Sequence, residues 1–520
     1  MRSRSLISLL LIGLVLAACG TDGGVVATRS RQNDAQNVPD TDQTATTTTT
    51  DGTQTTDSPP TTDNGATSST SPTSSTNNTL AVPGGQTVID FGSSKTPRSY
   101  DGFLVAAFTD IEKFWTIQFP IIDDAPFTPL KGGIFAAYKS RQEPIPGCGT
   151  AQTTYVDVEG NAFYCSLGDF IVYDDDELLP QLVDSLGQSA VGVVLAHEFG
   201  HAIQFRNKDF AQPTILKEQQ ADCFAGAWAA HLSRGETPGL TFGDQEIKEG
   251  LIAMIQVRDP VDGGGLADPN AHGTGFDRVG AFQDGFIGGV KRCKTFFTED
   301  REKSLIDIPA VAGDASRGNL PLTDPSHSDI VTLIPNDLTR FWTEQLAGAK
   351  NLTFTPPTLL LYPSGGPFPP CKGVSDSEYK DNIFLCDATN QVMVDQGFAQ
   401  ALRDNPVTGD MSVGYLIGEA YSEAVQKVLS SKLTGTKRVL LDDCFTGAWV
   451  KDVIPPIPES RGTDGIELSA GDLDEAVIEA IKRSDTTSDV NLRGTAFDKI
   501  NAFRSCVLGG LQKCQDSFGS

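Results

Sequence analysis

Residues 189–204 read SAVGVVLAHEFGHAIQ, an apolar run that predicts a buried helix from Val191 to Ile203. Because residues four apart share one face of a helix, the imidazoles of His197 and His201 can reach the same cation. Glu198 would then lie beside the open coordination position, where it can act as a general base. The five-residue motif is expected by chance about 0.003 times in a chain of this length, so a purely packing role for the histidine pair is the weaker interpretation.

A third ligand is expected from the segment that follows. Leu216 to Leu232 has a helical composition, and on that helix Glu218 and Asp222 lie four residues apart on the same face. A catalytic zinc takes three protein ligands, so one carboxylate can bind the cation while the other accepts the free ring N–H of a ligand histidine. The spacing alone does not decide which carboxylate has which role.

The quoted motifs together resemble a known family. HEFGH followed by Glu218-Gln-Gln-Ala-Asp-Cys-Phe-Ala-Gly226, with Phe163-Tyr-Cys165 upstream and His272-Gly-Thr downstream, is similar to the bacterial putative neutral zinc metallopeptidases over residues 100–300. The resemblance implies an α+β fold, with a zincin-like helical domain and a small β-sheet. It also implies the site residues, which would be His197, His201 and Glu218 as zinc ligands, Glu198 as general base and Asp222 as the residue that orients a ligand histidine.

Several other polar residues allow two interpretations. His272 could stabilise the oxyanion of a tetrahedral intermediate, or it could be a loop histidine in a structural turn. His231 and His327 have no motif around them and are expected at the surface. The acidic run from Asp174 to Glu177 could bind calcium, although a helix cap and first turn over Glu177 to Val183 is the preferred interpretation.

The second half of the chain reads as a diverged copy of the first. Residues 411–426, MSVGYLIGEAYSEAVQ, align without gaps with residues 189–204. Further blocks match in the same order, namely Asn161–Cys165 with Asn382–Cys386, Asp222–Trp228 with Asp443–Trp449, and His272–Val279 with Arg493–Ile500. The nearly constant shift indicates a tandem duplication, with domains over residues 82–300 and 326–520 joined by a linker over 301–325.

The second copy lacks the predicted zinc chemistry. In the alignment, His197, Glu198, His201 and Glu218 fall on Glu419, Ala420, Glu423 and Val439. Two carboxylates without an imidazole form a poor zinc site. The sequence therefore predicts one Zn²⁺ per chain. It also predicts a second domain that keeps the fold and either covers a face of the first domain or binds a substrate or wall component.

Ten cysteines and an export signal favour disulfides in an oxidising compartment. The repeat pairs cysteines within their own halves, as Cys148–Cys165, Cys223–Cys293, Cys371–Cys386 and Cys444–Cys514. The first pair would flank a hairpin with its turn at Glu159–Asn161. Cys506 is left over in this scheme, and buried thiols are the alternative to disulfides.

The N-terminus carries a targeting segment. A basic start precedes the apolar run from Leu6 to Leu16, and Leu16-Ala-Ala-Cys19 resembles a bacterial lipobox. We expect a signal peptide over residues 1–18 and a lipid on Cys19, with a freely secreted form as the alternative. Residues 19–81, rich in Ser and Thr, would form a disordered tether. The protein would thus be extracytoplasmic and lipid-anchored to the bacterial cell membrane.

Charge and motif together limit the function classes. A formal net charge of -27 argues against nucleic acid or an anionic membrane surface as the main partner. The motif and the resemblance favour a zinc metallopeptidase that hydrolyses peptide bonds in a protein or peptide substrate, with Glu198 as its base. The alternatives are a non-catalytic binding or scaffold lipoprotein and a zinc amidase acting on cell-wall peptides.

Overall fold

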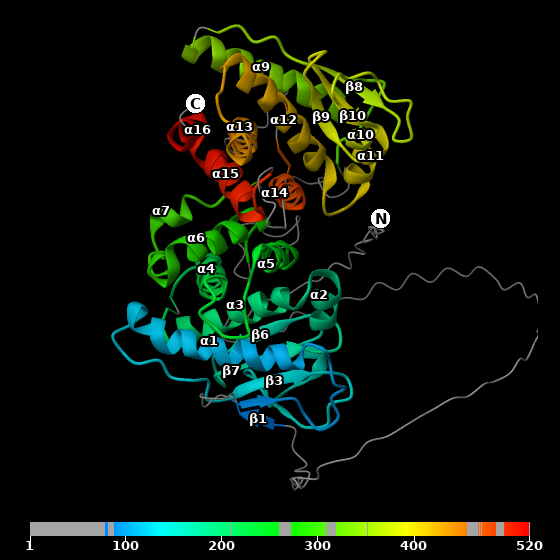
Figure 1. The fold of residues 1–520 in the computed structure, drawn as a ribbon. Helices are drawn as coiled ribbons and strands as arrows, with labels where there is room; N and C mark the ends of the chain where they lie inside the picture. Colours follow the sequence, from blue (N-terminus) through cyan, green and yellow to red (C-terminus); the bar gives the residue numbers. More distant parts are fainter. Residues whose placement is uncertain are drawn as a thin grey trace, which may run out of the picture. The chain divides into compact units, whose positions relative to one another are not determined.

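The computed structural model describes residues 79–81, 88–209, 211–258, 272–306, 308, 319–350, 352–454, 466, 468–469, 471–484 and 493–518, all within one compact unit (Figure 1). The predicted signal peptide, Cys19 and most of the predicted tether lie outside these described residues. Among the described helices, none combines the length and the hydropathy needed to cross a membrane.

A five-stranded mixed sheet lies in the first half of the chain, in the order β1-β2-β3-β7-β6. Its strands are β1 (Thr79–Ala81), β2 (Val88–Asp90), β3 (Gly133–Ala137), β6 (Ala162–Cys165) and β7 (Phe170–Asp174). β2, β3 and β7 run parallel, whereas β1 and β6 pair antiparallel at the two edges. The short strands β4 (Ile145–Pro146) and β5 (Gln152–Thr153) pair separately. β3 and β7 are buried along their whole length, as expected of central strands covered on both faces.

Helices form the rest of the first half. They are α1 (Asp101–Ile122), α2 (Leu178–Leu186), α3 (Gln188–Asn207), α4 (Thr214–Ser233), α5 (Asp244–Gln256), α6 (Gly275–Cys293) and α7 (Glu299–Glu302), with the 3₁₀ turn η1 (Tyr155–Asp157). α3 is buried almost all round because its residues are apolar or small on most faces. α4 and α6 lie side by side (Figure 1) and approach closely at Gly226, where a Cβ would come within 2.0 Å of the carbonyl oxygen of Phe282.

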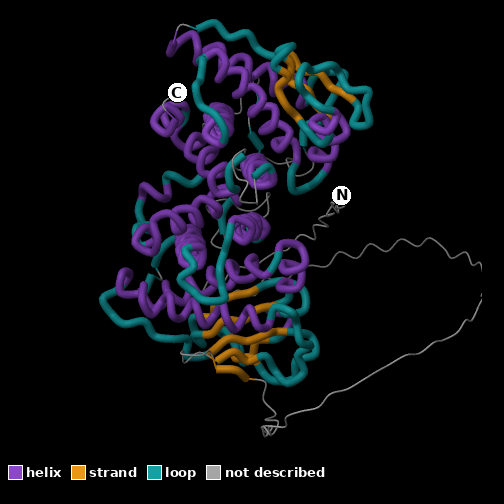
Figure 2. The backbone as a smooth tube through the Cα atoms, in the orientation of Figure 1, coloured by secondary structure: helices purple, strands orange, loops and turns teal. Residues whose placement is uncertain are grey.

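The second half has the same kind of architecture. In its sheet, β8 (Thr358–Tyr362) runs parallel to β10 (Gln391–Asp395), which pairs antiparallel with β9 (Ile383–Cys386). Its helices are α9 (Ile330–Lys350), α10 (Asp376–Tyr379), α11 (Gln396–Asp404), α12 (Gly409–Val428), α13 (Thr436–Val453), α14 (Asp472–Lys482), α15 (Ala496–Gly509) and α16 (Leu511–Phe518). Nε1 of Trp449 donates to Asp337 at 2.8 Å, as Nε1 of Trp228 donates to Asp110 at 2.9 Å in the first half. The protein is therefore α+β and mostly helical with small sheets (Figure 2), which confirms the predicted class.

Some local predictions need correction. Thr79–Ala81, assigned to the tether, form strand β1 against β2. The hairpin predicted around Glu159–Asn161 is wrong, because β6 pairs instead with β7 across a turn in which Asp169 has a φ of 51°. Arg301, assigned to the linker, is buried and lies 3.1 Å from Asp284 of α6, so the first half extends beyond the predicted boundary.

The cysteine sulfurs meet within their own halves of the chain. At bonding distance lie Cys148 and Cys165, Cys223 and Cys293, and Cys371 and Cys386. Cys444 has two such neighbours, Cys506 and Cys514, and all three are fully buried. Cys506, which the repeat-based pairing left without a partner, is therefore an alternative to Cys514 as the disulfide partner of Cys444.

Candidate metal centre

Two helices bring together the three residues implied as metal ligands. α3 presents His197 and His201 on one face, with their Nε2 atoms 3.1 Å apart. α4 places Glu218 opposite them, with Oε2 3.2 Å from Nε2 of His197 and Oε1 3.4 Å from Nε2 of His201. The three side chains thus converge on one point beneath the protein surface.

This spacing fits a metal ion of the size of zinc. Zinc binds imidazole nitrogen and carboxylate oxygen at about 2.0–2.1 Å in a tetrahedron, whose edges are then about 3.3 Å long. The separations of 3.1–3.4 Å match those edges. Oε2 of Glu218 is buried, and apart from its approach to Nε2 of His197 it has no hydrogen-bond partner among the described residues, so it has an acceptor position to offer a cation. Two imidazoles and a carboxylate are also a donor set that catalytic zinc uses.

Of the two carboxylates between which the spacing did not decide, Asp222 is the one that contacts Nδ1 of a histidine ring. It lies one turn beyond Glu218 on α4, and its Oδ1 is 2.7 Å from Nδ1 of His197. This contact favours the tautomer in which Nδ1 carries the proton and Nε2 presents its lone pair to the cluster. His201 is oriented in the same way, by Oε1 of Gln204 at 2.9 Å from its Nδ1.

Glu198 lies beside the converging ligands. Its Oε2 accepts the backbone N–H of Tyr164 at 3.0 Å, which ties the edge strand β6 to the helix that carries the histidines. The residue is only 9% exposed, and this burial raises the pKa of its carboxyl above the ordinary value, although His197 and His201 act to lower it. A higher pKa makes the carboxylate a stronger proton acceptor.

The charges of the cluster depend on one another. Burial lowers the pKa of His197, but the carboxylates of Asp222 and Glu218 outweigh burial and raise that pKa to about 10. Burial acts to raise the pKa of Glu218, yet His201 and His197 hold it well below its ordinary value. A metal entering the cluster must therefore displace a proton from an imidazole.

Arg278 is a residue of the candidate site that the sequence motifs did not reveal. It lies on α6 and is 1% exposed. Its Nε donates to Oδ2 of Asp222 at 2.9 Å, and its Nη2 donates to Oδ1 at 2.8 Å. Burial acts to raise the pKa of Asp222, but this guanidinium and His197 keep it below its ordinary value. The sequence carried a signal for this contact, because the aligned positions in the two halves are both basic, as Arg278 and Lys499.

The structure does not bring His272 among the converging ligands. His272 is buried, and Gly273 after it has a φ of 100° and lies against Gln219 of α4, which fits the structural-turn interpretation. His327 is exposed, as predicted, whereas His231 is only partly exposed. Only 14% of its side chain is exposed, and its Nδ1 lies 2.8 Å from Glu236.

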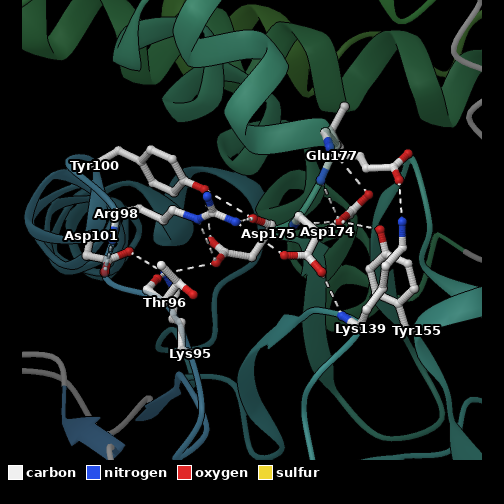
Figure 3. A network of polar contacts seen from close by, with 12 residues as sticks. Lys95, Thr96, Arg98, Tyr100, Asp101, Lys139, Tyr155, Asp174, Asp175 and Glu177 are labelled. Carbon is white, nitrogen blue, oxygen red and sulfur yellow. Dashed lines mark hydrogen bonds and ion pairs between the residues drawn. The ribbon is translucent and has the colours of Figure 1, made fainter. Parts of the chain in front are cut away.

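The acidic run before α2 is satisfied by protein partners (Figure 3). Asp174 accepts backbone N–H groups from several residues, which are Gly160, Asp176, Glu177 and Leu178. Asp175 lies 2.9 Å from Nζ of Lys95. α2 begins after Glu177, close to the predicted start, but Glu177 makes no side-chain cap hydrogen bond and Asp174 accepts the first N–H groups instead. Both carboxylates thus already have positive or N–H partners.

In the second half, basic side chains pair with the acids aligned to the metal centre. Nζ of Lys499 lies 2.8 Å from Oδ1 of Asp443 and 3.0 Å from Oε1 of Glu419. Nη2 of Arg438 lies 3.2 Å from Glu423. An ammonium group thus stands among the carboxylates where the first half gathers histidines for a cation.

Residues 84–296 match the sequence model of the family described as putative neutral zinc metallopeptidase, which confirms the resemblance drawn from the motifs. The uncharacterized protein Rv2575 of Mycobacterium tuberculosis is 31% identical over 179 residues, covering 30% of this chain and 59% of that protein. The uncharacterized protein YpfJ of Escherichia coli is 30% identical over 174 residues, covering 29% of this chain and 57% of that protein. The chain therefore spans less than two thirds of the length of these relatives. No solved structure gives a significant match.

Proposed function

We propose that this protein is a zinc metallopeptidase that hydrolyses peptide bonds, with the site between α3 and α4 as its active centre. The observation that carries the proposal is the convergence of His197, His201 and Glu218 with Glu198 beside them. When bound there, zinc would act as a Lewis acid that activates water and polarises a carbonyl oxygen. The family match over residues 84–296 supports the same reaction class.

The side chains around the ligands would move and orient the protons. Glu198 would take a proton from the attacking water and hand it to the leaving amine. Because the N–H of Tyr164 holds Oε2 of Glu198, the other carboxylate oxygen would act as the proton acceptor. Asp222, itself held by Arg278, would keep Nε2 of His197 directed at the metal position.

The position of β6 supports a peptide as the substrate. β6 is the last strand of its sheet, and the N–H of Tyr164 is directed at Glu198. An extended peptide that adds to this edge would meet the carbonyl groups of Ala162 and Tyr164, because their N–H groups already donate to Asn161 and Glu198. Its scissile bond would then pass the metal position beside Glu198.

The proposal assigns one Zn²⁺ to each chain and treats the second half as a tandem copy without zinc. The shared strand pairing of the two sheets and the matching Trp–Asp hydrogen bonds support a duplication. The ammonium of Lys499 supports the loss of zinc, because it pairs with Asp443 and Glu419 in the place of a cation. The second half would then serve the first as a structural partner.

We also propose that the enzyme acts outside the cytoplasm and is anchored to the cell membrane by a lipid on Cys19. The lipobox-like sequence before Cys19 supports the anchor. Cysteine sulfurs at bonding distance support an oxidising compartment. Labelling with a radioactive fatty acid in cells, lost in a Cys19→Ser variant, would test the anchor.

Incubation of an unfolded protein substrate with the purified full-length chain tests the activity. We expect cleavage that a chelator abolishes and added zinc restores, and no cleavage by the Glu198→Gln variant. A zinc-loaded chain that leaves the substrate intact would favour the scaffold alternative. Cleavage confined to cell-wall peptides would instead favour the amidase alternative.

A further inference from the structure

One carboxylate of the second half joins two segments beside the metal centre. Asp474, on α14, is 3% exposed. Its Oδ1 accepts the backbone N–H of Phe276 at 2.7 Å, and its Oδ2 lies 2.8 Å from Nε of Arg258. Phe276 lies in the first turn of α6, whereas Arg258 follows the end of α5. Two charge-assisted hydrogen bonds from one side chain thus fix these segments relative to each other.

Both of these segments position Arg278. Arg278 follows Phe276 by two residues on α6, so its Cα moves with the helix end that Asp474 holds. Its Nη1 donates to the carbonyl oxygen of Val257, which is the residue before Arg258. Asp474 therefore fixes both the backbone that carries the guanidinium and the carbonyl group that orients it.

The guanidinium of Arg278 contacts Asp222, which in turn contacts the proposed metal ligand His197. Nε and Nη2 of Arg278 donate to the two carboxylate oxygens of Asp222, at 2.9 and 2.8 Å. Oδ1 of Asp222 lies 2.7 Å from Nδ1 of His197, whose Nε2 faces the metal position. A continuous series of contacts between buried groups thus runs from Asp474 to His197.

Gly275 provides the room for this approach. A Cβ at Gly275 would lie 3.0 Å from the carboxyl carbon of Asp474 and 3.0 Å from Cγ2 of Ile255, so a side chain there would require these neighbours to shift. The aligned residue in the second half is Ala496, in the first turn of α15. Glycine therefore occurs in α6, the helix that carries Arg278, and alanine occurs at the aligned position of α15.

We propose that Asp474 is a positioning residue for the metal centre, through which the second half holds Arg278, Asp222 and His197 in their metal-binding arrangement. This inference rests on the proposed zinc site. It gives the second half a role in metal binding that requires no metal ligand in the second half itself. Its observable consequence is that zinc affinity in the first half depends on a side chain of the second half.

Zinc affinity of the full-length chain tests the proposal by competition with a chromophoric chelator. We expect Asp474→Ala to weaken zinc binding about tenfold, the lower end of the effect of removing an outer partner of a metal ligand. Gly275→Ala should weaken it similarly although the carboxylate is retained, which guards against a variant that simply fails to fold. The absorption spectrum of bound Co²⁺ should shift in both variants, because it reports the ligand geometry.

A matched control disturbs the contact between the halves elsewhere. Phe497→Leu alters the ring contact with Phe286, whose centroids are 4.8 Å apart, and should leave zinc affinity unchanged. In the double variant with Arg278→Lys, Asp474→Ala should add little to the effect of Arg278→Lys alone, because both act on one series of contacts. If the losses of zinc affinity instead add up in the double variant, Asp474 does not act through Arg278.

The outcomes separate this inference from the proposed activity. If the wild-type chain binds zinc tightly and Asp474→Ala binds it equally well, the positioning role is wrong. The role is also wrong if Phe497→Leu weakens zinc as much as Asp474→Ala does. A wild-type chain that binds zinc, responds to Asp474→Ala as expected and cleaves no peptide would refute the peptidase proposal and support the positioning role. A wild-type chain without zinc affinity would refute both.

Discussion

Replacing Glu198 by Gln separates the proposed chemistry from metal binding. The substitution keeps the size of the side chain, and the amide oxygen can still accept the N–H of Tyr164 that Oε2 accepts at 3.0 Å. His197, His201 and Glu218 are untouched, so the metal position keeps all its ligands. What the variant loses is a buried carboxylate whose pKa is raised by burial. The change therefore removes the proton acceptor and little else.

The expected loss follows from the role of a general base. Such a group contributes about 10²- to 10⁴-fold to the rate. At 1.36 kcal/mol for each factor of ten, kcat should fall by the equivalent of about 3–5 kcal/mol in the activation barrier. KM should change little, because the substrate would still meet the same strand edge and metal position. Zinc content should stay at the wild-type level.

Steady-state cleavage of a fluorogenic peptide, with zinc measured on the same samples, checks this expectation. Glu249→Gln is a matched control, because Glu249 on α5 contacts Ser189 of α3 and not the ligand cluster. That variant should keep wild-type kcat. A Glu198→Gln enzyme with zinc bound and near-normal kcat would refute the mechanism, since a neutral amide cannot take the proton.

Glu218→Ala should weaken zinc binding more than about 100-fold, beyond the effect of losing an outer partner, and full zinc occupancy would contradict its role as a ligand. Elemental analysis should find one zinc per chain, and two tightly bound ions would show that the second half still binds metal. Peptide mapping without reduction should find Cys444 joined to Cys506 in some molecules and to Cys514 in others, whereas a bond from Cys444 to the first half would contradict the structure. Because the pKa of His197 is raised to about 10, its charge stabilises the metal-free protein fully below pH 6.5 and progressively less as the pH rises toward 10. Zinc needs the neutral imidazole, so the increase in Tm on adding zinc should be larger at about pH 9 than at about pH 6, and equal increases would contradict this coupling.

The convergence of the candidate metal ligands could be predicted because most of its geometry is local. Two histidines four apart on one helix must share a face, and α3 has that form. Spacing could not choose between Glu218 and Asp222, because both lie on the same face of α4. The choice depends on Arg278, which reaches Asp222 from α6, a helix distant in sequence. Contacts of this kind depend on tertiary packing, which periodicity does not encode.

The cysteine pairing of the second half could also be predicted only in part from the sequence. The repeat could align Cys514 with Cys293, but it could not place the extra Cys506. α15 ends and α16 begins on either side of Gly510, which has a φ of 66°. This break lets sulfurs from both helices face Cys444. The outcome depends on one backbone conformation, which residue spacing did not reveal.

Asp222 and Asp443 are both fully buried, and a buried carboxylate needs a positive partner in either half. Arg278 provides it with a planar fork that contacts both oxygens of Asp222 and still leaves Oδ1 in contact with His197. Lys499 provides a compact ammonium that also reaches Glu419, among the side chains aligned with the metal ligands. A positive charge there would repel a metal ion, so the lysine suits a half that has no histidines at the aligned positions. Burial raises the pKa of Asp443 to about 7 although Lys499 acts to lower it, whereas Arg278 and His197 outweigh burial and hold the pKa of Asp222 below its ordinary value. The arginine at position 278 thus keeps Asp222 charged and in contact with His197, which suits the proposed metal centre.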